Sequence, residues 1–246
     1  MLCDGQLNMM PGNFEPSVKL CVNSPWNRKG AKGQLQRKPA IPLKNSVKTI
    51  VQKKLEEYEG RYNHMYLDSK GKVTIGIGHL IASKGSVATI KLHKTKNNQP
   101  TTPASLKEKQ DEYSNVLKQK KNYKASWYKQ FTKLVMKEAD INAQRDKHIT
   151  TFYTELSGMY SKAKGYTNDF DAMPDEVQLA LFDMIFNLGQ TKLRTIFINF
   201  NKAIKQEKWD EAAKQSNQPD VNAARNAYVK TLLTNAHTKA KRLSKN

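Results

Sequence analysis

The stretch between residues 47 and 79 changes its periodicity within a few positions, and this change limits the folds open to the chain. Apolar side chains recur at helical spacing in its first part: Val47, Ile50, Val51, Leu55 and Tyr58. Gly60 is placed to end this helix. The next residues favour a hairpin, with a strand over 65–67, a turn over 69–71 and a returning strand over 73–77. The pattern predicts a helix that leads directly into a hairpin.

Two carboxyl groups occupy different environments in this predicted unit. Glu59 falls on the last turn of the helix, where the free carbonyl groups carry partial negative charge and disfavour an ionised side chain. Asp68 flanks the hairpin turn, where backbone N–H groups stabilise a carboxylate. A protonated and an ionised carboxyl group can act as general acid and general base. Taken alone, however, such residues are most often ordinary surface side chains.

The order of the residues in this unit resembles the catalytic segment of the T-even phage lysozymes, glycoside hydrolase family 24. Glu59, Asp68 and Thr74 have the spacing of that family, and Thr74 opens the run Thr-Ile-Gly-Ile-Gly-His that ends at His79. The resemblance implies that Glu59 is the general acid and Asp68 the general base. It assigns to Thr74 the placing of the attacking water.

The resemblance is strong over 50–80, moderate over 137–229 and absent over 1–45. It puts Leu80 and Phe186 among substrate-binding residues, although the pattern around Phe186 fits core packing equally well.

Three further residues have supporting roles by the same resemblance. Arg225 lies near the catalytic glutamate in the family, and His79 pairs with Asp146 across the boundary between two lobes. Such an ion pair predicts a raised pKa for His79 and a lowered pKa for Asp146.

The fold implied is α+β and mainly helical, with a small β-hairpin lobe and a larger helical lobe joined by a long helix. Residues 131–165 have the apolar spacing of that helix. Pro174 opens a nearly all-apolar helix that ends at Gly189, which predicts the buried centre of the larger lobe. The last residues, 238–246, carry basic side chains and no fold signal.

Two segments fall outside the resemblance. Residues 1–45 form an N-terminal basic arm without helical or strand periodicity, for which we expect targeting or docking. Cys3 and Cys21 lie in it, either as a disulfide or as two reduced thiols. The lysozyme domain spans 46–246 and includes a basic insertion around 83–130. We expect a loop over 80–102, then a helix opened by the capping box of Ser105 and Glu108, as a surface element rather than core.

The net charge of the chain indicates which classes of partner it attracts. The chain has 42 Lys and Arg against 22 Asp and Glu, a net charge of +20, which attracts polyanions. Anionic envelope polymers fit this charge. Nucleic acid is not expected, because the sequence has no nucleic-acid-binding motif. No His and Cys cluster has metal spacing and no phosphate-binding loop is present, so we expect neither a metal nor another cofactor.

These observations together predict a peptidoglycan hydrolase, a muramidase that acts in bacterial lysis or killing. No apolar run is long enough for a transmembrane segment and no signal peptide is evident, so we expect a protein made in the cytoplasm. We also expect a monomer. It would act in the periplasm or cell wall of a target bacterium as a phage endolysin, a tail lysozyme or a secreted antibacterial effector. Delivery machinery or an immunity protein would then be partners. The alternatives are a non-catalytic peptidoglycan-binding module and a basic nucleic-acid-binding protein.

Overall fold

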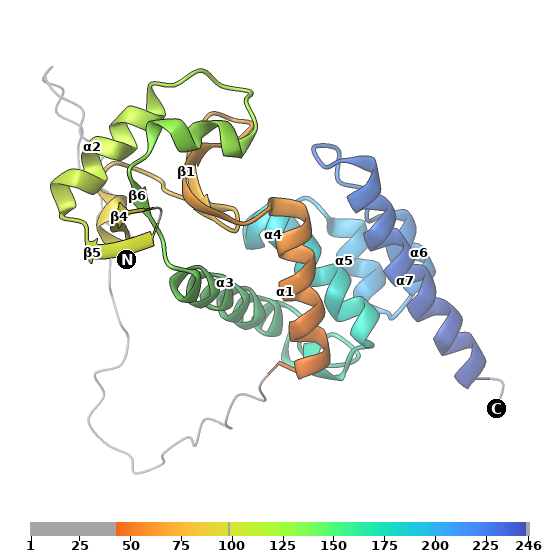
Figure 1. Ribbon diagram of the computed structural model, residues 1–246. Coiled ribbons are helices and arrows are strands. Elements are labelled where there is room, and N and C mark those ends of the chain that lie inside the picture. The colour runs from red at the N-terminus through yellow and green to blue at the C-terminus, as the bar shows by residue number, and fades with distance from the viewer. Residues whose placement is uncertain (1–42, 98, 245–246) are drawn as a thin grey trace, which may run out of the picture. The chain divides into compact units, whose positions relative to one another are not determined.

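The computed structural model describes residues 43–97 and 99–244. The predicted arm, with Cys3 and Cys21, lies outside this part apart from its last three residues. Helices predominate in the described chain, and two antiparallel sheets of three strands each accompany them (Figure 1). The prediction of an α+β, mainly helical fold is confirmed.

Helix α1, Asn45–Glu59, carries the predicted acid on its last residue. It buries Val47, Val51 and Leu55, whereas Ile50 is 41% exposed on its outer face. Gly60 ends the helix with a φ of +71°, and a Cβ atom there would lie 2.6 Å from the ring of Tyr62. Glycine is therefore required by both the backbone and the available space.

The first sheet confirms the predicted hairpin and adds a short third strand. Its strands are β1 Tyr62–Leu67, β2 Val73–Gly76 and β3 His79–Leu80. Thr74 lies in the central strand, opposite Tyr66 on one side and Leu80 on the other. Gly76 and Gly78 both have positive φ, 69° and 64°, and allow the chain to reverse between β2 and β3.

The insertion is folded, and two expectations about it were wrong. Its elements are a 3₁₀ helix at Ser86–Thr89, β4 His93–Lys96, β5 Gln99–Pro103, α2 Leu106–Leu117, a 3₁₀ helix η2 at Ala125–Phe131, and β6 Leu134–Val135. The expected loop over 80–102 contains strands β4 and β5, which pair with β6 in the order β5-β4-β6. The capping box is confirmed, since Glu108 N donates to Ser105 Oγ and Ser105 N donates to Glu108.

The insertion also supplies core, which the lysine-rich composition concealed. Its buried apolar side chains include Val87, Ile90, Leu92, Tyr113, Val116 and Tyr128. The lysines occupy the outer faces of the same elements, so composition alone predicted a surface element.

Helix α3, Glu138–Met159, leads from the two sheets to the remaining helices (Figure 1). It begins at residue 138 rather than 131, because residues 134–135 form β6. The later helices are α4 Asp175–Thr195, α5 Ile198–Lys205, α6 Trp209–Lys214 and α7 Ala223–Leu243, with 3₁₀ turns at Lys162–Lys164 and Phe170–Ala172. Residues 238–243, expected to lack a fold, are the last turns of α7.

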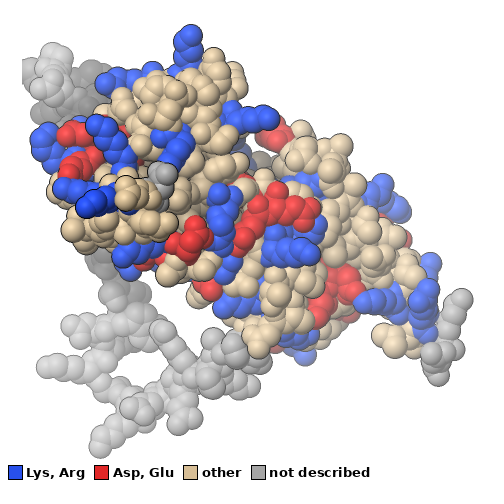
Figure 2. All heavy atoms as spheres, in the orientation of Figure 1, with Lys and Arg blue, Asp and Glu red and all other residues tan. Residues whose placement is uncertain are grey.

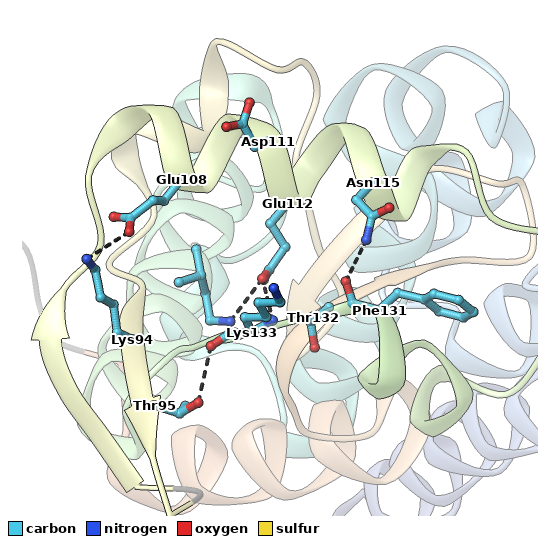
Figure 3. A pocket seen from close by; sticks show the side chains of 10 residues that line it. Lys94, Thr95, Glu108, Asp111, Glu112, Asn115, Phe131, Thr132 and Lys133 are labelled. Atoms are coloured by element: carbon cyan, nitrogen blue, oxygen red, sulfur yellow. Dashed lines mark hydrogen bonds and ion pairs between the residues drawn. The ribbon is translucent and has the colours of Figure 1, made fainter.

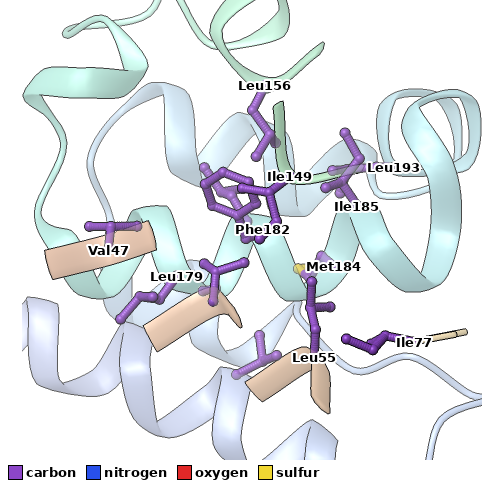
Figure 4. Packing of buried hydrophobic residues seen from close by; sticks show 14 of the residues in the cluster. Val47, Leu55, Ile77, Ile149, Leu156, Leu179, Phe182, Met184, Ile185 and Leu193 are labelled. Atoms are coloured by element: carbon purple, nitrogen blue, oxygen red, sulfur yellow. The ribbon is translucent and has the colours of Figure 1, made fainter. Parts of the chain in front are cut away.

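Helices α1, α3 and α4 meet in a core around Ile149, Phe182 and Ile185 (Figure 4). Helix α4 is interrupted at Gly189, whose φ of 70° and ψ of 160° are not helical, so the predicted helix end is confirmed. Within the described residues, no helix is long and apolar enough to cross a membrane.

Candidate functional site

Three helices converge on Glu59 through one buried arginine. Arg225 is 5% exposed, and its Nη1 donates to Glu59 Oε1 at 3.0 Å while its Nε donates to Asp183 Oδ2 at 2.9 Å. Arg225 lies in the first turn of α7, where the Asn222 side chain accepts its backbone N–H and caps the helix. The expected position of Arg225 beside Glu59 is confirmed.

The guanidinium of Arg225 is held on its faces as well as its edges. Its Cζ lies 4.6 Å from the ring centroid of Tyr58 and 5.4 Å from that of Phe186. Asp183 also accepts a 3.1 Å hydrogen bond from Asn187. Burial raises the pKa of Asp183, and the charge and hydrogen bond of Arg225 oppose this effect. The arginine therefore has little freedom to leave Glu59.

The glycine run of the hairpin lies against the same carboxylate. A Cβ atom on Gly78 would lie 3.0 Å from Glu59 Oε2, and Gly78 has a positive φ. Any larger residue would displace the Glu59 side chain. Glu59 is thus in contact with the helices through Arg225 and with the hairpin through Gly78.

The hairpin holds Asp68 and Thr74 through one residue between them. Asp68 Oδ1 accepts from the backbone N–H groups of Lys70 and Lys72, at 2.9 and 2.8 Å, so the expected backbone donors are present. The hydroxyl of Thr74 is buried and donates to the carbonyl of Lys72 at 3.2 Å. A fixed Asp68 and a hydroxyl on the adjoining strand are brought together.

Tyr66 connects the two carboxylates electrostatically and was missed in the sequence. It is buried opposite Thr74. Burial raises its pKa, and the negative charges of Glu59 and Asp68 raise it further. Both carboxylates therefore raise the pKa of the same phenol group, and Tyr66 lies between Glu59 and Asp68 in the sequence.

The predicted pair of His79 and Asp146 is wrong. His79 Nδ1 lies 2.7 Å from His148 Nε2. Asp146 accepts instead from Gln52 at 2.8 Å and from Arg145 at 3.0 Å. Positions 146 and 148 differ by about 200° around a helix, so only one of them can face β3.

The pKa of His79 is accordingly lowered rather than raised. Burial is the main cause, followed by the charges of His148 and Lys147, and the pKa falls to about 4. The expected direction for Asp146 is right, although its partners differ: burial raises its pKa, but the hydrogen bonds from Gln52 and Arg145 outweigh burial and lower it.

The two expected substrate-binding residues have different surroundings. Leu80 is 49% exposed at the end of β3. Phe186 is half-buried, with its ring centroid 5.8 Å from that of Phe152, and it packs on Arg225. Of the two, only Phe186 is tied to Glu59, through its contact with Arg225.

A cavity of about 640 Å³ lies away from the predicted catalytic residues, in the insertion (Figure 3). Glu112 lines it and was not identified in the sequence. Its Oε2 accepts from the backbone N–H groups of Lys133 and Leu134 at 2.5 and 2.9 Å, which ties α2 to β6. Burial raises the pKa of Glu112 to about 7. These two hydrogen bonds give Glu112 a structural role.

Among the described residues, no group of three or more His, Cys, Asp or Glu side chains is arranged to hold a metal ion. No protein-family model matches the sequence, and no curated protein matches it.

Proposed function

We propose that the protein is a peptidoglycan hydrolase, a muramidase that cleaves the β-1,4 bond between N-acetylmuramic acid and N-acetylglucosamine. The observation that carries this proposal is the placement of Glu59. Its carboxylate contacts Arg225 from the helices and Gly78 from the hairpin that bears Asp68 and Thr74. The resemblance of residues 50–80 to the T-even phage lysozymes supports the same assignment.

In this mechanism Glu59 protonates the oxygen of the leaving sugar. The Arg225 guanidinium, fixed at 3.0 Å, stabilises the carboxylate that remains. Asp68 accepts a proton from water, which attacks the anomeric carbon from the opposite face, and the Thr74 hydroxyl helps to place that water. A water held between the two carboxyl groups inverts the anomeric configuration.

Asp183 and Tyr58 hold Arg225 in place, and Asn187 donates to Asp183; none of the three takes part in a chemical step. Leu80 and Phe186 would contact the saccharide. The substrate would be the cell wall of a target bacterium, with a net charge of +20 favouring approach to its anionic polymers.

Clearing of a bacterial cell-wall suspension tests this function. Glu59→Gln and Asp68→Asn should each lower the clearing rate by roughly two to four orders of magnitude, because each removes a proton-transfer group. Glu57→Gln is the matched control, since Glu57 is on the same helix and its side chain is 50% exposed. It should clear the suspension at the wild-type rate.

Folding of all variants is checked by circular dichroism. Clearing by Glu59→Gln at the control rate would refute the assignment of the acid. Sedimentation of the wild-type protein with cell walls that it does not clear would indicate a non-catalytic binding module. Hydrolysis of the β-linkage that forms the new reducing end as the α-anomer, detected by NMR, would support inversion.

A further inference from the structure

The segment from Lys118 to Lys133 joins α2 to β6 through η2 and carries an unbalanced positive charge. No acidic residue occurs between Glu112 and Glu138. Six lysines of the segment are exposed: Lys118, Lys120, Lys121, Lys124, Lys129 and Lys133. None of the six forms an ion pair with a carboxylate of the described chain.

Aromatic side chains are interleaved with these lysines. The rings of Tyr123 and Trp127 stack with centroids 4.0 Å apart and planes inclined by 18°, and Phe131 lies 4.8 Å from Trp127. Tyr123 is 45% exposed, and Leu117 at the end of α2 is 47% exposed. In Figure 2 this end of the insertion shows Lys and Arg spheres around uncharged surface.

We propose that the surface formed by residues 117–133, the basic aromatic surface, docks the protein on an anionic phospholipid bilayer. Lysine clusters of this size are attracted by the negative surface potential of such a bilayer. Tyrosine and tryptophan favour the interface because their rings are apolar and their polar atoms reach water. Leu117 and Tyr123 add exposed apolar area, which a bilayer covers and a chain of phosphodiesters does not.

Single-stranded nucleic acid fits this surface less well. Its bases stack on aromatic side chains whose faces are open. Here Tyr123 covers one face of Trp127, and Tyr128 and Phe131 also lie against the indole, at centroid distances of 5.1 and 4.8 Å.

The surface adjoins the hairpin of the candidate site. A Cβ atom on Gly71, three residues after Asp68, would meet the aliphatic chain of Lys121 at 2.5 Å. Docking would thus hold the Asp68 hairpin near the bilayer. The inference goes beyond the proposed hydrolysis and does not depend on it.

Vesicle co-sedimentation of the full chain tests the proposal. Wild-type protein should bind vesicles of equal parts phosphatidylcholine and phosphatidylglycerol, and should not bind phosphatidylcholine alone. The triple variant Lys120→Gln, Lys121→Gln and Lys124→Gln should bind at least roughly tenfold more weakly, because each lysine near an anionic surface contributes to binding.

The matched control removes the same charge elsewhere. Lys202, Lys208 and Lys230 are exposed, so a triple glutamine variant at these positions isolates the effect of net charge. It should bind within about twofold of wild type. Equal weakening of the two triple variants would overturn the proposal, as would equal binding to both vesicle types. Tighter binding of the protein to a single-stranded oligonucleotide than to the anionic vesicles, weakened only in the first variant, would instead assign the surface to nucleic acid.

Discussion

Glu59 and Asp183 accept hydrogen bonds from two different nitrogen atoms of one guanidinium, that of Arg225, at 3.0 and 2.9 Å. One positive charge thus serves two carboxylates. Asp183 is buried, with 7% of its surface exposed. Its contribution to the candidate site is to fix Arg225, which makes it a positioning residue.

Asp183→Asn should lower kcat by roughly tenfold to a hundredfold with little change in KM. The amide keeps the size of the side chain but removes the charge that holds Arg225, and small displacements of a catalytic group have effects of this size. Steady-state hydrolysis of purified peptidoglycan measures both constants. Asp210→Asn, at a position 50% exposed, is the control. Unchanged kcat in a folded Asp183→Asn protein would contradict the positioning role.

The contact between His79 and His148 predicts a loss of stability in acid. Burial is the first cause that lowers the pKa of both residues, to about 4 for His79. The folded pKa lies below the unfolded value, so the unfolded chain takes up protons first. The contribution of the two histidines to the free energy of unfolding should therefore decrease as the pH falls from about 6.5 towards 4.

Urea unfolding at pH 7 and at pH 4.5 measures this decrease. From pH 7 to pH 4.5 the free energy of unfolding of the double variant His79→Gln and His148→Gln should rise relative to that of wild type, whereas that of His237→Gln should keep its difference from wild type. If the double variant loses as much stability as wild type, the acid sensitivity originates elsewhere.

Glu112 predicts the opposite dependence over an overlapping pH range, so variants of each group are needed to separate the two contributions. Burial raises its pKa to about 7, so the folded state keeps the proton that the unfolded state loses. Its contribution is complete below the unfolded value near 4.5 and is lost as the pH rises through 7, by on the order of 3 kcal/mol. Glu112→Gln should remove this dependence between pH 4.5 and 7 in equilibrium unfolding. If the free energy of unfolding depends on pH in the same way in wild type and in Glu112→Gln, Glu112 is not the group responsible.

A chain that begins at Leu43 should hydrolyse purified peptidoglycan at the wild-type rate. Leu43 packs on the core, and Lys44 forms an ion pair with Asp175 at 2.9 Å, so the truncation leaves these contacts in place. Reducing-sugar release measures the rate. Loss of hydrolysis in a truncated protein that folds would place residues 1–42 in the active site instead.

The local features were predictable because neighbouring residues determine them. The end of α1 at Gly60, the hairpin around Asp68 and the capping box at Ser105 follow from patterns of a few residues. Strand β4 was missed because its sequence, His-Lys-Thr-Lys, lacks the alternation of apolar and polar side chains that identifies a strand.

The partners of buried polar groups were harder to predict, because they depend on packing. The rotation of α3 about its axis places His148, and not Asp146, against His79. The sequence did indicate that two of these carboxyl groups are buried. Asp183 is the one acidic residue in the apolar run 177–189 of α4, and Glu112 precedes the buried Tyr113. Arg225 was identified by resemblance alone, since its own sequence context suggests an exposed helix residue.

The bond between Arg225 and Glu59 joins residues 166 positions apart. During synthesis both carboxylates and the hairpin leave the ribosome long before α7 does. A nascent or prematurely ended chain thus carries Glu59 without the guanidinium of Arg225. The candidate site is completed only by the last helix of the described chain. Assembly of the whole domain is therefore a condition for completing the candidate site.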